Sequence, residues 1–191
     1  MFYEIEVRSH VRVSPRNFSK NIKEAVLDSV NSQFSSYVSK DLGTVIGVSE
    51  IIKICDGIII AGDGAAYYDT TYEILAFKPE LQEVIHGNIT EIADFGAFIN
   101  LGPLDGMIHI SQTMDDFVSF SKVGILAGKE TKRVLKTGDK CRARIVAISY
   151  KEIQNPKIGL TMRQPWLGNL LWIEDEIKKQ KKDVPKEEKK K

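Results

Sequence analysis

The chain opens with an alternation of apolar and polar residues from Phe2 to Val13. This pattern predicts a β-strand with one buried face. Ser14-Pro15 follows, and apolar residues then recur at steps of three and four from Phe18 to Tyr37. The spacing predicts an amphipathic helix that begins at Ser14-Pro15, ends near Asp41 to Gly43 and covers one face of a sheet.

Two β-rich runs follow, Thr44 to Cys55 and Gly57 to Ala61, and a glycine-rich turn joins them to a third, Tyr67 to Phe77. Glycines supply the positive φ angles of tight turns, so Gly62-Asp63-Gly64 predicts a β-hairpin. The residues on both sides of the turn are apolar, whereas a solvated hairpin tip would be polar. Two interpretations stay open, burial in the chain's own core and insertion into another protein. The candidate docking residues are Ile60, Ala61, Gly62, Asp63, Gly64 and Ala65.

The pattern changes after Lys78-Pro79-Glu80, which indicates a domain boundary. Short strands separated by glycine turns follow, and no long helix interrupts them. Five such strands predict a small closed barrel. They are expected at Val84 to Ile92, Ala97 to Leu101, Gly106 to Ile110, Lys140 to Ser149 and Lys157 to Met162.

The sequence therefore predicts an α+β chain in two folded parts, residues 1–82 and 83–173, with a tail at 174–191. The tail is charged and almost without apolar residues, so it is expected to be disordered. It either keeps the protein in solution or makes weak contacts with phosphates.

Composition limits the class of protein. The 191 residues are 42% apolar, which suffices for a core in each part, and no run reaches the roughly 18 apolar residues of a membrane span. Charges in the first ten residues exclude a signal peptide, so a cytoplasmic protein is expected. Cys55 and Cys141 form no CxxC pair and are interpreted as small buried residues, with no metal site and no cofactor.

No combination of residues supports catalysis. Asp94-Phe95-Gly96 matches the magnesium-binding triplet of protein kinases, but the glycine-rich loop, strand lysine and catalytic loop that a kinase needs are absent from the sequence. The three histidines form no close pair, and Asp115-Asp116 is interpreted as solvated charge or a helix cap. The chain is therefore predicted not to be an enzyme.

Phe95 and Phe98 suggest nucleic-acid binding instead. Alternation would send the two rings to opposite faces of a strand, but a bulge or twist at Gly96 can bring them onto the same face. Aromatic rings exposed on a sheet stack with unpaired bases. His109, at the end of the next strand, adds a third flat ring. Basic side chains on later strands are expected to meet phosphates, namely Arg142, Arg144 and Lys157.

The second part resembles the S-one family of RNA-binding OB folds. The matching segments are Gly87 to Ile92, Asp94 to Phe98, Gly106 to Ser111, Leu135 to Lys140 and Lys157 to Thr161. By this resemblance Phe95, Phe98 and His109 correspond to the RNA-stacking face, and Lys157 to a basic contact. Ser149 stands where many members carry an aspartate, and the insertion from Thr113 to Lys132 is longer than usual. Its apolar residues are expected to pack on a partner or on the barrel, namely Phe117, Val118, Phe120 and Val123.

Residues 1–173 together resemble the larger stalk subunits of multisubunit RNA polymerases, called E-prime in archaea, with an equivalent in eukaryotic polymerase II. Phe2 to Ile5, Ile59 to Ala65 and Asp94 to Phe98 carry this resemblance. It implies a truncated RNP-like N-terminal domain whose tip docks on the core polymerase. It also implies a heterodimer with the smaller stalk subunit, which is called F in archaea, and an OB barrel that binds nascent single-stranded RNA. The alternative function is a free RNA-binding protein of translation or RNA decay.

Overall fold

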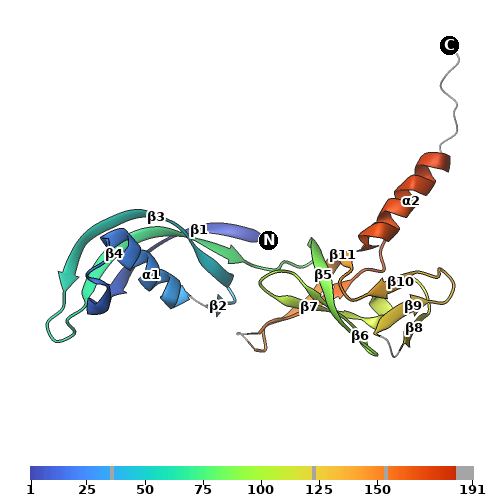
Figure 1. The fold of residues 1–191 in the computed structure, drawn as a ribbon, viewed down its shortest axis with the longest axis horizontal. Helices are drawn as coiled ribbons and strands as arrows, with labels where there is room; N and C mark the ends of the chain where they lie inside the picture. The colour runs from blue at the N-terminus through green and yellow to red at the C-terminus, as the bar shows by residue number, and fades with distance from the viewer. Residues whose placement is uncertain (35–36, 122–123, 153–154, 184–191) are drawn as a thin grey trace, which may run out of the picture. The chain divides into compact units, whose positions relative to one another are not determined.

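The computed structural model describes residues 1–34, 37–121, 124–152 and 155–183, with only the backbone described for residues 180–183. The chain divides into two compact units, Met1–Pro79 and Glu80–Lys191. Figure 1 shows a helix and a sheet in the first unit and mainly strands in the second. The predicted α+β class is confirmed.

The first unit is a four-stranded sheet with the order β1-β4-β3-β2. Strand β1 (Phe2–Val13) pairs antiparallel with β4 (Ala66–Phe77), and β4 pairs with β3 (Gly43–Ile59). The short β2 (Val38–Ser39) pairs only with the first two residues of β3. The predicted first strand and the hairpin between β3 and β4 are confirmed.

Helix α1 (Ile22–Phe34) is shorter than predicted. Ser14-Pro15 begins a 3-10 turn, Pro15–Asn17, but the Ser14 side chain makes no capping hydrogen bond. Instead Asn21 accepts from the backbone N–H of Lys23 at 3.2 Å, as an N-cap residue does. The predicted extension to Gly43 is wrong, because residues 38–39 and 43 onward join the sheet. Residues 35–36 lie outside the described part.

The core of this unit lies between α1 and the sheet, which curves over the helix (Figure 1). Three helical side chains at steps of one and four are buried, Ala25, Val26 and Val30. They meet buried residues of the strands, namely Val11, Val13, Val45, Tyr72 and Ile74. Alternation in β1 and β4 therefore gives the sheet one apolar face, which α1 covers.

Strand β3 is irregular along most of its length. Its register with β4 shifts between Val45 and Gly47, Val48 and Glu50, Ile51 and Lys53, and Ile54 and Gly57. Bulges of this kind bend a strand and increase its twist. The repeated shifts allow the 17 residues of β3 to follow the 12 of β4 around α1.

The second unit contains the predicted five-stranded barrel. Its strands are β5 (Val84–Ala93), β6 (Gly96–Asn100), β7 (Asp105–His109), β11 (Lys140–Ser149) and β12 (Lys157–Thr161). They run in the order β12-β7-β6-β5-β11, and pairing of β11 with β12 closes the barrel. Alternate side chains fill its interior, among them Ile89, Ile99, Ile108, Ile145, Ile158 and Leu160.

The long insertion between β7 and β11 forms a 3-10 turn, η2 (Ile110–Gln112), and a three-stranded sheet. The strands are β8 (Val118–Ser121), β9 (Ile125–Gly128) and β10 (Val134–Lys136). Val118 packs against the barrel core, whereas Phe117 and Phe120 are 75% and 39% exposed. Val123 lies outside the described residues. The insertion therefore covers the barrel only in part.

The charged tail differs from its prediction. Two strand residues, β13 (Gly168–Asn169), lead directly into helix α2 (Leu170–Asp183). Ile173 is buried, and Trp172 packs on the barrel core under the guanidinium of Arg133, 5.5 Å from its ring centroid. Arg133 also pairs with Glu176. These contacts attach the first turns of α2 to the barrel. Residues 184–191 lie outside the described part.

Candidate RNA platform and docking tip

The two phenylalanines expected to stack on RNA lie together. The rings of Phe95 and Phe98 are 5.9 Å apart between centroids and meet edge to face at 86°. Gly96 permits this approach, because a Cβ there would lie 2.2 Å from the carbonyl oxygen of Ile108 on β7. The two strands close tightly at the glycine, and the rings stay on the outer surface. Phe95 is 48% exposed and Phe98 is half-buried.

His109 and Met107 extend this surface across β7. Met107 pairs with Phe98 and His109 pairs with Gly96, so both point outward like Phe98, and both are exposed. The Nδ1 atom of His109 lies 2.8 Å from the hydroxyl oxygen of Ser111 and accepts from the Ser111 backbone N–H. These contacts orient the imidazole ring. We call Phe95, Phe98, Met107 and His109 the aromatic platform.

Sequence reasoning assigned no role to Met107. The alternation in Gly106 to Ile110 was the available signal, since it puts Met107 and His109 on one face. A methionine beside aromatic rings adds a polarizable contact surface.

The three basic candidates are not equally close to the platform. Lys157 is exposed at the start of β12, which pairs in parallel with β7. Arg142 and Arg144 lie on β11, opposite His86 and Val84 of β5. Strand β5 separates β11 from β6, and β12 separates it from β7. The structure thus brings Lys157 to the strand next to the platform and keeps both arginines one strand further away.

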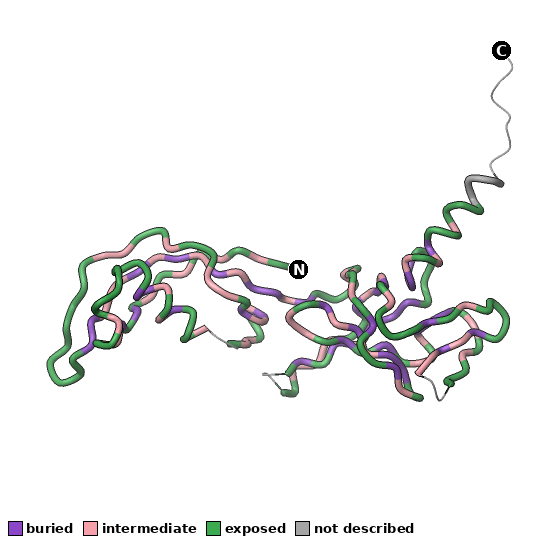
Figure 2. Tube along the Cα trace, viewed as in Figure 1, coloured by how far each residue is buried: buried purple, intermediate pink, exposed green. Residues whose placement is uncertain are grey.

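The hairpin tip between β3 and β4 is exposed in this chain. Ile58, Ile59 and Ile60 are 66%, 67% and 50% exposed, and Figure 2 shows the loop in the colour of exposed residues. Ala61 to Gly64 are exposed as well, whereas Ala65 is fully buried. Burial of the whole tip in the chain's own core is therefore excluded, and Ala65 does not belong to the exposed surface.

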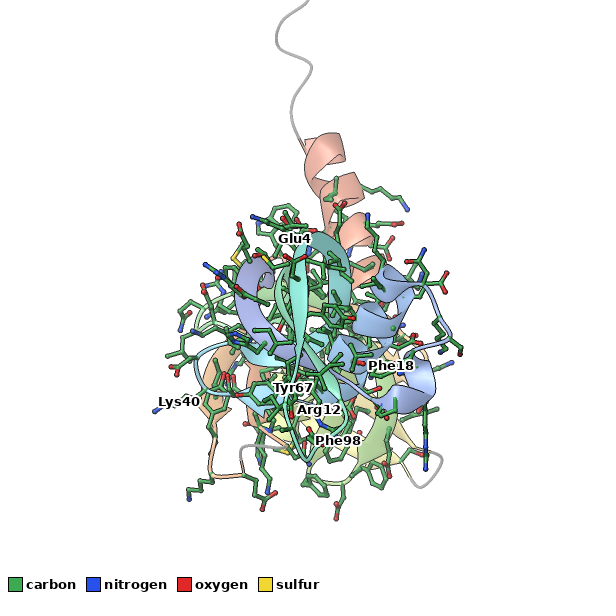
Figure 3. The ribbon with its side chains drawn as sticks, turned by 90° about the vertical axis from the view of Figure 1, so that its left-hand side faces the viewer. Glu4, Arg12, Phe18, Lys40, Tyr67 and Phe98 are labelled. Carbon is green, nitrogen blue, oxygen red and sulfur yellow. The ribbon has the colours of Figure 1, made fainter. Side chains whose placement is uncertain are left out.

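A polar cluster holds the tip in place. Arg12 of β1 donates to both carboxylate oxygens of Asp63, from Nε at 2.9 Å and from Nη2 at 2.6 Å. The Tyr67 hydroxyl donates to the same carboxylate at 2.5 Å. Figure 3 labels Arg12 and Tyr67 at this end of the sheet. The hydrogen bonds from Arg12 lower the pKa of Asp63 to about 2, so the carboxylate is charged at neutral pH.

An apolar groove of about 350 Å³ continues from the tip toward α1. Phe18, Ile22 and Ile59 line it, and all three are at least 49% exposed. The periodic pattern had assigned Phe18 and Ile22 to the core. Helix α1 begins only at Ile22, which leaves both side chains outside the buried stripe. The exposed apolar surface is thus wider than the hairpin alone.

The remaining candidates have structural roles or none. Asp116 accepts from the backbone N–H groups of Phe117, Glu130 and Thr131, and the Thr131 bond contributes most to lowering the pKa of Asp116. Burial raises the pKa of Cys141 to about 12, while Cys55 is only half-buried. Within the described ranges, no group of three His, Cys, Asp or Glu could hold a metal ion. No described helix is long and apolar enough to cross a membrane.

Comparison with known proteins identifies both units. Residues 78–153 match the S1 RNA binding domain, and residues 8–64 match the SHS2 domain found in the N terminus of Rpb7p and Rpc25p. The chain is also 39% identical to DNA-directed RNA polymerase subunit Rpo7 of Saccharolobus solfataricus over 175 residues, which is 91% of this chain and 97% of that protein.

This chain belongs to the Rpo7 family of RNA polymerase stalk subunits. A second Rpo7, from Sulfolobus acidocaldarius, is 36% identical and covers 95% of this chain and all of that protein. RNA polymerase III subunit RPC8 of Saccharomyces cerevisiae is 24% identical over 99% of this chain and 90% of its own length. The resemblance to larger stalk subunits is confirmed, and so is the succession of an RNP-like fold and an OB barrel.

Among solved structures, the apo form of Mycoplasma genitalium RNase R is similar over 42% of this chain and 13% of that protein. The match has 30% identity and a TM-score of 0.37.

Proposed function

We propose that this Rpo7-family chain docks on core RNA polymerase through its hairpin tip and holds nascent single-stranded RNA on its barrel, in the cytoplasm. It performs no catalytic step of its own. It forms a heterodimer with the smaller stalk subunit of the polymerase. The domain limits expected from the sequence, 1–82 and 83–173, correspond in this proposal to docking and RNA binding.

The exposed tip is the observation that supports docking. Three consecutive isoleucines, at positions 58–60, are at least half exposed, so both faces of the strand present apolar surface to water. Isolated apolar side chains are normal on a protein surface, but a contiguous patch indicates an interaction site. The Arg12–Asp63–Tyr67 cluster fixes the tip before it binds, which reduces the entropy lost on docking.

The aromatic platform supports RNA binding. Exposed rings on an OB fold stack with bases without strong sequence preference, since every base has a π face. Lys157 lies on the strand that pairs with β7, and in this proposal it meets a backbone phosphate. Arg142 and Arg144, on the strand beyond β12, would contact nucleotides further along the strand of RNA.

Reconstitution tests the docking part. Core polymerase prepared without its stalk is mixed with the smaller stalk subunit and this chain, and the mixture is separated by gel filtration. The wild-type chain should comigrate with the core, and Ile60→Asp should not. Ile52→Asp should comigrate, because Ile52 lies on β3 away from the tip. Comigration of both variants would contradict docking through the tip and favour a free RNA-binding module.

Crosslinking tests the RNA part. Transcribing complexes that contain a photoreactive uridine analogue in the emerging transcript are irradiated, and the crosslinked peptides are identified. Crosslinks should fall in β6 and β7, on peptides that contain Phe95, Phe98 or His109. Transcript crosslinks confined to the first unit would contradict the proposed binding face.

A further inference from the structure

A depression of about 430 Å³ opens next to the aromatic platform, between the barrel and the insertion. Ile110 and Ser111 line it and directly follow His109. The backbone N–H of Ile110 donates to the carbonyl oxygen of Phe95 at 2.9 Å. The depression therefore begins where the platform ends.

An exposed aromatic ring forms one wall. Phe117 is 75% exposed, although its backbone is held in place. Its N–H donates to Asp116 at 2.6 Å, and its carbonyl accepts from Lys129 at 3.0 Å. The Asp116 carboxylate is fully used by such bonds and fixes the loop. A rigid backbone thus presents a large apolar side chain to solvent, and a flat ligand can stack on it.

The charged residues that line the depression disfavour the binding of a phosphate. Asp115, Asp116 and Glu130 line it with a single cation, Arg163. Arg163 donates from Nε to Asp115 at 2.8 Å, and both side chains are more than half exposed. Three carboxylates against one guanidinium repel a phosphate and accept an uncharged base.

We propose that this depression binds one splayed-out base of the RNA, with a preference for guanine. The inference rests on the proposed RNA-binding function. An OB fold contacts about 4 to 16 nucleotides, whereas a platform of two or three rings holds only about two or three bases. The remaining bases of the bound RNA therefore lie beyond the platform. Phe117 supplies a stacking face. The Watson–Crick edge of guanine has two adjacent donors, N1–H and N2–H2, beside the O6 acceptor, so the two oxygens of the Asp115 carboxylate can accept from both donors while Arg163 donates to O6. Adenine has a single donor group, N6–H2, beside the acceptor N1, and it can make only one of the two bonds to the carboxylate.

Fluorescence anisotropy with the full chain and labelled RNA tests this. The probes are a uridine oligomer of about 12 nucleotides with one central guanosine, the same oligomer with adenosine instead, and a uridine tetramer. Phe117→Ala should weaken binding of the guanosine oligomer by about fivefold or more and change tetramer binding little. Phe120→Ala is the matched control, since Phe120 is an exposed phenylalanine of the same insertion that does not line the depression. Asp115→Asn should abolish the difference between guanosine and adenosine.

Several results would contradict the proposal that the depression binds a base. If Phe117→Ala binds the long oligomers as the wild type does and Phe98→Ala binds them more weakly, the depression does not bind RNA but the platform does. Unchanged binding by both variants would mean that the proposed RNA function itself fails. If Phe117→Ala binds RNA normally but no longer comigrates with polymerase, Phe117 contacts a protein and not RNA. Equal affinity of the wild-type chain for guanosine and adenosine oligomers would exclude the base preference.

Discussion

Replacing two tip isoleucines with threonine tests the proposed docking of the tip on core polymerase. Full burial of an isoleucine side chain is worth about 1.5–3 kcal/mol. Ile58 and Ile59 are 66% and 67% exposed, so about two-thirds of that value, roughly 1–2 kcal/mol each, remains to be gained when a partner covers them. The double variant Ile58→Thr/Ile59→Thr should therefore lose about 2–4 kcal/mol, which weakens the affinity for core polymerase by about 30- to 1000-fold.

The assay is equilibrium binding of the chain to immobilised stalk-free core polymerase, with and without the smaller stalk subunit. Threonine is β-branched like isoleucine, so the strand should keep its conformation. Since both side chains already lie mainly in water, the unfolding midpoint should stay close to that of the wild type.

The control is Ile46→Thr/Ile52→Thr, which makes the same chemical change on the same strand at residues that are 46% and 51% exposed. It should bind like the wild type. If the control loses as much affinity as the tip variant, the docking surface lies along β3 and not at the hairpin. If neither loses affinity, the exposed isoleucines do not contact the core enzyme.

Three further predictions concern single residues. Phe98→Ala should weaken binding of single-stranded RNA by about 1–3 kcal/mol in an anisotropy titration and leave the melting temperature unchanged, whereas unfolding would show that the ring belongs to the core. The Asp63 carboxyl, with its pKa lowered to about 2, should contribute stability that is present above about pH 4 and is lost as the pH falls through about 2. A carbon NMR titration should give that midpoint, and Arg12→Gln should raise the pKa toward its ordinary value; a wild-type midpoint near 4 would contradict the geometry. Gly96→Ala should destabilise the protein by about 1–3 kcal/mol in urea unfolding because its Cβ meets the facing strand. Gly102→Ala should cost less, since both glycines have a positive φ that strains an alanine but a Cβ at Gly102 has open space.

Much of the fold follows from periodicity. Alternation locates the first strand and the five barrel strands within about a residue or two, because each strand has one face in a core and one in water. The glycine turn locates the hairpin, because the positive φ angles that it needs depend only on the residues of the turn. The start of α1 could not be predicted from the sequence. Ser14 and Asn21 are both capping residue types, and only Asn21 makes the capping hydrogen bond. Helix α2 was missed because Arg133 and Trp172, which anchor it, meet only in the folded chain.

The candidate site divides in the same way. The approach of Phe95 and Phe98 could be predicted, because the cause, Gly96, lies between them in the sequence. The Arg12–Asp63 bond joins residues 51 positions apart and leaves no local signal. Exposure of Phe18 and Ile22 could not be predicted either, because apolar periodicity does not tell where the helix begins. Docking and RNA binding by these residues stay predictions.

The irregular pairing of β3 affects how the subunit behaves before it is assembled. Beyond Thr44, no other described strand pairs with the free edge of β3, and this edge strand carries several exposed isoleucines. An exposed apolar edge of this length invites strands of other molecules and leads to aggregation. The four register shifts interrupt the even repeat of backbone donors and acceptors that an incoming strand would need. A newly made chain can therefore expose the apolar tip to water without forming intermolecular sheets.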